Sequence, residues 1–463
     1  MALLGKGENR VLGSRFAINV LWALLGRGGA IGAGLVVMAL MTRILSPSKM
    51  GIFYVAQSIV LLAGPLASFG LQQPTVRAIA AAKASGNLSE AKAFARASIR
   101  AIFLTSSSIA ILYIVISGSV SQWTGPRIEN RMSLNFLMAI WIVILAAESQ
   151  LVAVLQGLEK IRDASVYEGT LGRLLLVPAL LVTWIFFSHA ELIIILLMFV
   201  GCEVVSVALA ALKVRTLLSA LGEPSSSGPT FGQLWKEAWP FLSQTMAGTI
   251  ALRSGALILS AFRSHADVAV YGVATRLADM LLLPAAVINV PLAPSVARLH
   301  AQGERAKMQQ LLQAAALWPT IIGVFVTGIW IIFGGSFLKR AFGSAYGSGD
   351  SILVVLSIGN CLISFLGPCA LALAMTGEQR VVTLVGVIGL IVQLVLSVVL
   401  VKLYGAFGLA LCLIGVALGM KFSWWIFARR RIGINTRANL VPFGHWIRDL
   451  RGLKWTLNLG PED

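Results

Sequence analysis

The stretch LIIILLMFVGCEVVSVALAAL, from Leu192 to Leu212, is apolar at nearly every position and carries one charged residue, Glu203. A helix needs roughly 20 such residues to cross a bilayer core of about 30 Å, because each residue adds about 1.5 Å. Membrane-spanning β-strands instead alternate polar and apolar residues over about 10 positions, which this stretch does not do. The stretch therefore predicts a transmembrane helix.

The composition extends this prediction to the whole chain. Of its 463 residues, 57% are hydrophobic and 12% are charged, about half the charged share of a soluble domain. Counting apolar runs of about 20 residues gives twelve predicted spans. They lie at about 14–41, 51–75, 99–121, 133–157, 168–188, 190–212, 239–262, 270–297, 312–333, 351–375, 381–402 and 406–427. We therefore expect an all-α, multi-pass membrane protein.

The positive charges predict the orientation of these spans. If the N-terminus is inside and the spans are even in number, the inner segments hold 23 of the 37 lysines and arginines, and the outer loops hold eight. Short loops rich in Lys and Arg stay in the cytoplasm, so both termini are expected there. The net charge of +18 follows from this asymmetry, and we expect no nucleic-acid partner. The first span is too long for a cleavable signal peptide.

The longest connection divides the twelve spans into two sets of six. It covers residues 213–238 and has a cluster of Ser, Gly and Pro at its centre, as linkers do. We therefore expect an N-terminal six-helix bundle over 1–212 and a C-terminal six-helix bundle over 239–427. Residues 428–463 are expected to form a basic cytoplasmic tail, in which residues 443–453 fit an amphipathic helix on an anionic membrane surface.

The two halves share a pattern of Gly, Pro and Arg. Gly51–Arg77 and Gly272–Arg298 both cover 26 steps of the chain, and each has a proline in mid-span, Pro65 or Pro284. Because each half has an even number of spans, the two copies have the same orientation and relate by a pseudo-twofold axis along the membrane normal. This arrangement is typical of transporters that rock two bundles about a central cavity.

Three prolines within the spans are candidate hinges for such a motion: Pro65, Pro284 and Pro291. A proline removes one backbone hydrogen bond from a helix and so weakens it locally. The alternative, that these prolines produce kinks that only shape the packing, stays open.

Two stretches resemble a known family. They are TRILSPSKMGIFYVAQSIVLLAGPLASFGLQQPTVRAIA (residues 42–80) and VAVYGVATRLADMLLLPAAVINVPLAPSVARL (residues 268–299). The first resembles the outer loop and second helix, and the second the eighth helix, of the polysaccharide-export and O-antigen flippase family. That family belongs to the multidrug/oligosaccharidyl-lipid/polysaccharide (MOP) exporter superfamily. The resemblance covers the whole chain in topology and implies a fold like that of the MATE transporters.

The resemblance implies a transporter and not an enzyme. A flippase of this family moves a polyprenyl-diphosphate-linked oligosaccharide, such as an O-antigen or exopolysaccharide repeat unit, across the bacterial cytoplasmic (inner) membrane by alternating access. The expected partners are this lipid-linked glycan and membrane lipids, with the polysaccharide polymerase and the chain-length machinery as further candidates. No cofactor is expected, and coupling to H⁺ or Na⁺ stays open.

The stretch LLGRGGAIGAG, residues 24–34, places Arg27 in the middle of the first span. A central arginine costs about 3 kcal/mol on insertion scales, so it needs a compensating role. Arg253 holds the matching position in the second half, and Arg276 lies in the eighth span. Because guanidinium groups bind phosphate oxygens in a fork, we expect these three arginines to line a cationic substrate cavity. Pairing with acids, such as Asp279 three residues from Arg276, is the alternative.

Three acids lie within the spans: Glu148, Glu203 and Asp279. A carboxylate in a low-dielectric environment favours its protonated form, so each is a candidate for proton or Na⁺ coupling. Ion pairing with an arginine is the alternative. Arg173 and Lys421 lie nearer the cytoplasmic ends of their spans, where they either snorkel to the surface or line an inner vestibule.

Other transporters and a membrane enzyme are the competing interpretations. A MATE-type cation-coupled small-molecule antiporter would need an acidic, aromatic cavity. A flippase for peptidoglycan precursors usually has two further spans at its C-terminus. A glycan polymerase or glycosyltransferase would need a sizeable outer loop or a metal-binding loop. The longest outer loop expected here, 334–350, has one acid, and the His, Cys, Asp and Glu residues do not have the spacing of metal ligands.

Overall fold

The computed structural model describes residues 28–29, 31–124, 131–186, 191–221 and 229–439. Every regular element in these residues is helical. The first half, which we call the N-half, has the N-terminal helix Ile31–Ile44, α2 Pro47–Ala67, α3 Gln72–Ala84, α4 Leu88–Thr124, α5 Arg131–Gly157, α6 Ile161–Tyr167, α7 Thr170–Phe186 and α8 Leu192–Ser219. The second half, the C-half, has α9 Phe231–Phe262, α10 His265–Asp279, η1 Met280–Leu282, α11 Leu283–Ala301, α12 Arg305–Phe342, η2 Ser344–Gly349, α13 Asp350–Phe365, α14 Cys369–Met375, α15 Gln379–Phe427 and η3 Ala428–Ile432.

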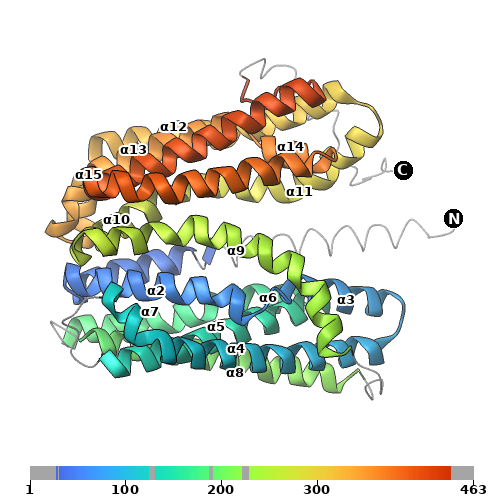
Figure 1. The fold of residues 1–463 in the computed structure, drawn as a ribbon, viewed down its shortest axis with the longest axis horizontal. Coiled ribbons are helices and arrows are strands. Elements are labelled where there is room, and N and C mark those ends of the chain that lie inside the picture. The colour runs from blue at the N-terminus through green and yellow to red at the C-terminus, as the bar shows by residue number, and fades with distance from the viewer. Residues whose placement is uncertain (1–27, 30, 125–130, 187–190, 222–228, 440–463) are drawn as a thin grey trace, which may run out of the picture.

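The helices form two bundles (Figure 1). Helices α2 to α8 pack mainly on one another, and α11 to α15 do the same, while α9 and α10 lie between the two sets. Helices α9 and α10 both contact α2, which makes α2 the main N-half element at the junction. This arrangement confirms the predicted all-α fold of two bundles.

Within the described residues, the helices match the predicted spans; the start of the first span, 14–27, and the predicted amphipathic helix at 443–453 lie outside those residues. In the described residues, ten segments are long and apolar enough to cross a membrane, and the shorter helix Ile31–Ile44 is also apolar. Helix α15 has 49 residues and would measure about 74 Å if it were straight, but it turns at Gly405 (φ 62°, ψ −139°). Ser397 Oγ lies 3.3 Å from Cys412 Sγ across this turn, so the two parts run antiparallel. Helix α15 thus contains the last two predicted spans.

Two spans predicted as continuous helices are interrupted. The span 51–75 breaks at Gly70 (φ 67°), between α2 and α3, and the span 351–375 breaks at Gly367 (φ 75°), between α13 and α14. At the first break the backbone of α9 comes close, because a Cβ atom on Gly70 would lie 2.6 Å from the backbone nitrogen of Leu242. Contacts with distant segments therefore set these breaks.

Two other segments differ from the prediction in detail. The span 270–297 is divided by the 3₁₀ turn η1 into α10 and α11, and Pro284 lies in the first turn of α11. The expected outer loop 334–350 is mostly helical, because α12 continues to Phe342 and η2 follows it. Phe342 and Tyr346 are 3% and 2% exposed, so burial of their rings extends the helical structure.

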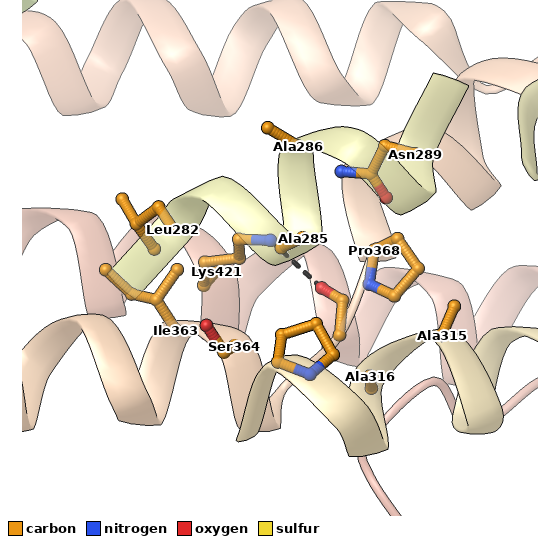
Figure 2. Close-up of a pocket in the computed structure, with 12 residues that line it drawn as sticks. Leu282, Ala285, Ala286, Asn289, Ala315, Ala316, Ile363, Ser364, Pro368 and Lys421 are labelled. Atoms are coloured by element: carbon orange, nitrogen blue, oxygen red, sulfur yellow. Dashed lines mark hydrogen bonds between the residues drawn. The ribbon is translucent and has the colours of Figure 1, made fainter. Parts of the chain in front are cut away.

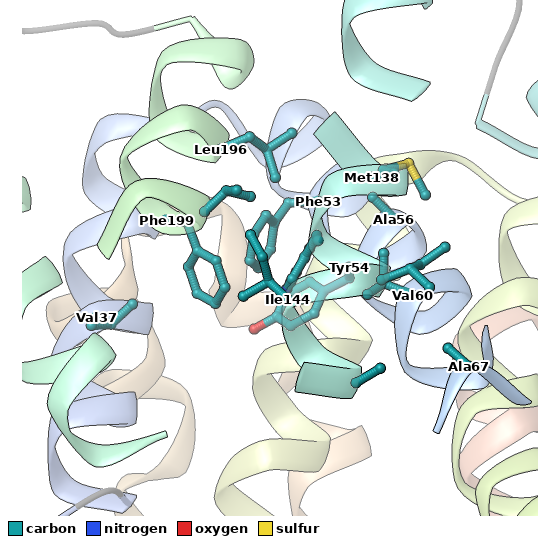
Figure 3. Packing of buried hydrophobic residues seen from close by; sticks show 14 of the residues in the cluster. Val37, Phe53, Tyr54, Ala56, Val60, Ala67, Met138, Ile144, Leu196 and Phe199 are labelled. Carbon is teal, nitrogen blue, oxygen red and sulfur yellow. The ribbon is translucent and has the colours of Figure 1, made fainter. Parts of the chain in front are cut away.

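Aromatic rings form the centre of the N-half core. Phe53 of α2 stacks on Trp141 of α5 with centroids 6.1 Å apart, and it meets Phe199 of α8 edge-on at 5.8 Å. Figure 3 shows Ile144 and Leu196 beside these rings. Such ring pairs add about 0.5–1.5 kcal/mol each to the stabilisation from buried area. They hold α2 firmly on α5 and α8, and α2 in turn meets the C-half.

Large apolar side chains point outward from the bundles. Val115 of α4 is 75% exposed and Ile332 of α12 is 72% exposed. A soluble protein rarely exposes so many large apolar groups together, and acyl chains are the solvent that suits them. The exposed faces therefore agree with a multi-pass membrane protein.

Candidate functional site

Three of the predicted charged residues meet inside the N-half. Glu148 lies on α5, Arg173 on α7 and Glu203 on α8, and Arg173 interacts electrostatically with both carboxylates. Helix α8 approaches α7 closely, because a Cβ atom on Gly172 would lie 2.6 Å from a carboxylate oxygen of Glu203. The backbone N–H of Gly169 donates a hydrogen bond to Glu148. We call Glu148, Arg173 and Glu203 the N-half cluster.

The N-half cluster has two carboxylates for one guanidinium, and a third carboxylate, that of Glu168, interacts electrostatically with Arg173 and Glu148. Glu203 is 7% exposed, and its Oε2 has no hydrogen-bond partner among the described residues. A buried carboxylate oxygen is costly to keep charged when it lacks a partner. Carboxylates thus outnumber the guanidinium around Arg173, and a proton or a cation can neutralise the excess negative charge.

A second group of charges, which we call the C-half cluster, consists of Arg253 on α9 and of Arg276 and Asp279 on α10. Asp279 interacts electrostatically with both Arg276 and Arg253, but the alternative of a close Arg276–Asp279 salt bridge is not among the salt bridges of the described residues. Arg276 instead reaches α2, where its Nη2 donates to Gln57 Oε1 at 3.3 Å. The side chain of Asn360 hydrogen-bonds to Asp279.

Arg276 links the two clusters. It interacts electrostatically with Arg173 of the N-half and with Arg253 of the C-half. Arg276 and Asp279 are exposed, and Arg253 is half-buried. Arg276 of α10 is thus within electrostatic range of one guanidinium on α7 and of another on α9. Guanidinium groups bind phosphate or carboxylate oxygens.

Arg27 lies outside the described residues, so its predicted place in the cavity stays a prediction. The helix that follows it passes close to the N-half cluster. A Cβ atom on Gly29 would lie 3.9 Å from Thr170, and one on Gly34 would lie 3.9 Å from Cδ of Arg173. The glycine-rich stretch thus brings the backbone of the first helix beside α7.

At the predicted outer end, an arginine of the N-half caps a helix of the C-half. The guanidinium of Arg43, at the end of the N-terminal helix, donates to the carbonyl oxygens of Arg340 and Ala341. These carbonyls belong to the last turn of α12. No N–H group of the helix donates to carbonyls in this turn, and the C-terminal end of a helix carries a partial negative charge. Arg43 therefore fastens the two halves together at this end.

Two glycines of the repeated pattern lie in the same contact. Gly51 of α2 packs on the backbone of His265, and a Cβ atom there would overlap its carbonyl group. Gly272 of α10 packs on Tyr54, whose ring would lie 2.8 Å from an added Cβ atom. We call the contacts of Arg43, Gly51 and Gly272 the outer seal. The halves are closed there in this structure.

Helix α9 is attached to both halves. Near its start, Trp235 stacks on Phe69 of the N-half with centroids 3.7 Å apart. Near its end, the carbonyl of Ala251 accepts a hydrogen bond of 2.7 Å from Gln393 of α15. Arg253 comes directly after this second attachment, so its helix is held in the C-half at the level of the charge cluster.

Lys421 and the three hinge prolines lie outside both clusters. Lys421 is on α15, and its Nζ donates to the carbonyl of Gly367 at 2.9 Å. Pro65 lies inside α2, near its end. Pro284 follows the break at η1, and Pro291 lies inside α11. Of the three hinge candidates, Pro284 is thus the one placed directly at an interruption of helical structure.

Sequence reasoning did not select three residues that take part in the site. Gln57 and Asn360 are two of several amide side chains within the predicted spans, each of which needs a hydrogen-bond partner, either a sugar or another helix, and the sequence does not favour one amide over the others. Arg43 gave no such signal, since it lies at the predicted end of a span, where arginines are common. In the described residues, no group of three or more His, Cys, Asp or Glu side chains is arranged to hold a metal ion.

The sequence matches one family model over more than half of the chain. The model is described as polysaccharide biosynthesis protein, and it covers residues 16–300. No curated protein matches the sequence.

Several solved structures have a similar fold. One is a multidrug resistance MATE family transporter of the MOP superfamily in an inward-facing conformation, with a TM-score of 0.71 and 14% identity over 87% of this chain and 94% of that chain. Another is the lipid II flippase MurJ in an inward closed conformation, with a TM-score of 0.70 and 12% identity over 88% of this chain and 87% of that chain. A MOP superfamily transporter from Pyrococcus furiosus has a TM-score of 0.61 and 12% identity over 91% of this chain and 95% of that chain.

At these low identities, the structural likeness shows the fold alone. The match to the family model carries the assignment further, because it covers both the N-half and the first helices of the C-half. The chain belongs to the polysaccharide biosynthesis protein family, and it has a multi-pass helical fold like that of the MOP superfamily transporters.

Proposed function

We propose that this protein is a flippase that moves a polyprenyl-diphosphate-linked oligosaccharide across the bacterial cytoplasmic membrane by alternating access. The observation that carries the proposal is the position of Arg276, which bonds to Gln57 across the two halves and interacts electrostatically with Arg173 on one side and Arg253 on the other. Membership of the polysaccharide biosynthesis family supports the choice of a glycan as cargo. Both termini would face the cytoplasm, and the polysaccharide polymerase and chain-length machinery would receive the product outside.

The proposed substrate has three parts with different requirements. Its diphosphate needs cationic donors, its glycan needs water, and its polyprenyl tail needs lipid. Arg253 and Arg276 would bind the diphosphate, because guanidinium donors form paired hydrogen bonds with phosphate oxygens. The exposure of Arg276 and Asp279 supports a hydrated region between the halves, where the glycan would cross while the tail stays in the bilayer.

The N-half cluster would couple this binding to a proton or to Na⁺. With both Glu148 and Glu203 charged, Arg173 is outnumbered and has little attraction left for a substrate anion. Neutralising one carboxylate removes the excess negative charge and makes the guanidinium available. Asp279 would act in the same way on Arg253 and Arg276 in the C-half.

The outer seal supports a cycle in which the halves separate at one end at a time. In this structure Arg43, Gly51 and Gly272 hold the predicted outer end closed. Export would require this contact to open while the opposite ends of the bundles approach. The break before Pro284 is the place where the α10–α11 pair would bend.

A MATE-type cation-coupled antiporter is the second candidate. It is favoured by the excess of carboxylates in the N-half cluster, because a site with two acids and one arginine suits a cation better than an anion. Under this alternative, Glu148 and Glu203 would bind the cation and the arginines would only orient them. Loss of an arginine would then leave cargo binding largely intact.

The test is a flipping assay in proteoliposomes that contain a fluorescently labelled polyprenyl-diphosphate oligosaccharide. Arg276→Ala is expected to slow flipping about 10- to 100-fold, since charged hydrogen bonds contribute about 1.5–3 kcal/mol. Arg276→Lys keeps the charge and should recover part of the rate. Arg380→Ala is the matched control, because Arg380 is exposed at the start of α15, away from the clusters.

Flipping by Arg276→Ala at the rate of the Arg380→Ala control would contradict the proposal. Folding of each variant is checked by its melting temperature and by size-exclusion chromatography, so that a slow rate is attributed to the site. Equal loss in Arg276→Lys and Arg276→Ala would indicate that fork geometry, and not charge alone, binds the diphosphate.

A further inference from the structure

A pocket lies in the C-half, and its lining includes none of the residues of the two charge clusters. We call it the C-half pocket. It has a volume of about 240 Å³ and lies between α11, α12, the α13–α14 break and the second part of α15 (Figure 2). Four alanines form much of its wall: Ala285, Ala286, Ala315 and Ala316. Its polar side chains are Lys421, Asn289 and Ser364.

The ammonium group of Lys421 is the charged group of this pocket. It donates to the carbonyl of Gly367 at 2.9 Å, the bond drawn as a dashed line in Figure 2. That carbonyl is available because the chain leaves the helical conformation at Gly367, between α13 and α14. An ammonium has three donors, so two remain after this bond.

Lys421 has no anionic partner among the described residues, whose salt bridges do not include it. A positive charge held within a membrane bundle is costly unless an anion compensates it. The structure thus combines a cavity with an uncompensated cation on its wall. This combination is suited to a ligand that carries an oxyanion.

The neighbouring polar groups are suited to hydroxyl groups. Asn289 on α11 presents an amide, which both donates and accepts hydrogen bonds. Ser364 donates its hydroxyl hydrogen to the carbonyl of Asn360 at 2.9 Å, which leaves its oxygen as an acceptor on the pocket wall. A ligand with an acidic group and several hydroxyls would satisfy all three side chains.

The size of the pocket suits one small unit of a glycan. Its 240 Å³ corresponds to about eight water molecules at roughly 30 Å³ each. Sites for drug-sized molecules begin at about 300 Å³. The C-half pocket therefore has room for a single sugar ring.

We infer that the C-half pocket binds an oxyanion carried by one sugar unit of the transported glycan, with Lys421 as the anion-binding residue and with Asn289 and Ser364 contacting sugar hydroxyls. The oxyanion is either the carboxylate of an acidic sugar or a sugar phosphate. The inference rests on the proposed function, since a carrier of glycans is what brings such a unit to the C-half. It makes Lys421 a specificity-determining residue that favours acidic over neutral glycans.

The test measures binding of three soluble sugars to the purified full-length protein in detergent, by titration calorimetry at millimolar sugar. The probes are glucuronate, glucose 1-phosphate and glucose. The wild-type protein is expected to bind at least one of the two acidic sugars about tenfold more tightly than glucose, the ratio that one charged hydrogen bond provides. Whichever of the two binds more tightly identifies the source of the oxyanion.

Lys421→Met is expected to lose this preference, because Met keeps the length of the side chain and removes its charge. Lys402→Met is the matched control on the same helix, since Lys402 lies over the ring of Phe262 with its nitrogen 4.9 Å from the ring centroid, away from the pocket. Lys421→Met should melt at the same temperature as the wild-type protein or at a higher one, because it removes an uncompensated charge. Melting curves therefore separate loss of binding from loss of folding.

Three results would overturn the inference. The wild-type protein could bind glucose and both acidic sugars equally well, it could bind neither acidic sugar, or Lys421→Met could keep the preference for acidic sugars. The experiment involves no transport. A protein that binds acidic sugars through Lys421 but does not flip lipid-linked glycans would contradict the proposed function and leave the pocket assignment standing. A protein that flips lipid-linked glycans but does not bind acidic sugars through Lys421 would contradict the pocket assignment alone.

Discussion

The net charge around Arg173 depends on the protonation of its carboxylate neighbours. Arg173 interacts with Glu148, Glu203 and Glu168, and on its other side with Arg276, so protonation of the carboxylates lowers the excess of negative charge. When the carboxylates are protonated, the guanidinium of Arg173 can bind an anionic substrate. When they are charged, the guanidinium pairs with them instead. Binding of a diphosphate is accordingly expected to weaken as pH rises.

Glu203→Gln should abolish much of this pH dependence. Gln removes the negative charge at every pH and keeps the shape of the side chain, so binding of a short-chain prenyl diphosphate should stay tight at mildly alkaline pH, where binding by the wild-type protein weakens. Glu159→Gln is the control, because Glu159 forms an exposed pair with Lys83 and should retain the wild-type profile. The measurement is titration calorimetry at several pH values. A Glu203→Gln profile identical to that of the wild type would exclude the coupling role.

At the scale of the element, α15 shows how one residue converts a long apolar segment into two spans. Gly405 has φ 62° and ψ −139°, a conformation that is essentially restricted to glycine. The turn is supported from α9, because the guanidinium of Arg263 donates to the carbonyls of Val401 at 3.3 Å and Lys402 at 3.0 Å. These are carbonyls at the end of the first part of the hairpin, which need an external donor.

Gly405→Ala is expected to destabilise the protein by about 1–3 kcal/mol, the cost of a non-glycine residue in such a conformation. Gly415→Ala is the matched control in the same helix. A Cβ atom there meets nothing within 4 Å, and alanine favours the helix over glycine. Thermal melting of both variants in one detergent measures the difference. Equal melting temperatures would show that Gly405 does not set the turn.

Among the helices, the sequence predicts the positions of the spans but not the places where they break. The positions of the spans follow from hydropathy, because the bilayer requires about 20 apolar residues whatever the fold. The breaks at Gly70 and Gly367 do not follow from it, since each depends on a distant segment. Gly70 lies on the backbone of α9, and Gly367 lies against the segment after α15, where Thr436 donates to the carbonyl of Leu366 at 2.8 Å.

The candidate site was predictable in its composition but not in its pairing. A charge inside an apolar span requires an explanation, and this rule selected the members of both clusters. The sequence does not reveal that Arg276 bonds to Gln57 across the halves and not to Asp279 beside it. Nor does it separate Lys421 from Arg173, because both lie near the predicted inner ends of spans. Such pairings depend on how the bundles pack.

At the scale of the whole molecule, the outer seal is the contact that must open during transport. Its two glycines have no room for a side chain, since Gly51 packs on the carbonyl of His265 and Gly272 on the ring of Tyr54. Closure of the predicted outer end therefore depends on the absence of a side chain at both positions. The repeated pattern of the two halves places these glycines on opposite sides of one junction.

Gly51→Ala is expected to shift the protein towards a state in which the predicted outer end is open. Spin labels on cysteines at Ser48 and Ala345, which are exposed on α2 and η2, report the separation of the halves by pulsed electron resonance. The distance distribution should move to longer values in Gly51→Ala and stay unchanged in Gly248→Ala, where a Cβ atom meets nothing within 4 Å. A Gly51→Ala distribution equal to that of the wild type would show that the seal tolerates a side chain.

The central claim is that the region between the bundles carries an anionic, lipid-linked glycan. The most direct measurement compares two cargoes in the same proteoliposomes: a labelled polyprenyl-diphosphate oligosaccharide and a labelled organic cation, each with and without a proton or Na⁺ gradient. The account predicts protein-dependent flipping of the diphosphate glycan, lost in Arg276→Ala, and no protein-dependent movement of the cation. Gradient-driven transport of the cation without flipping of the glycan would contradict it.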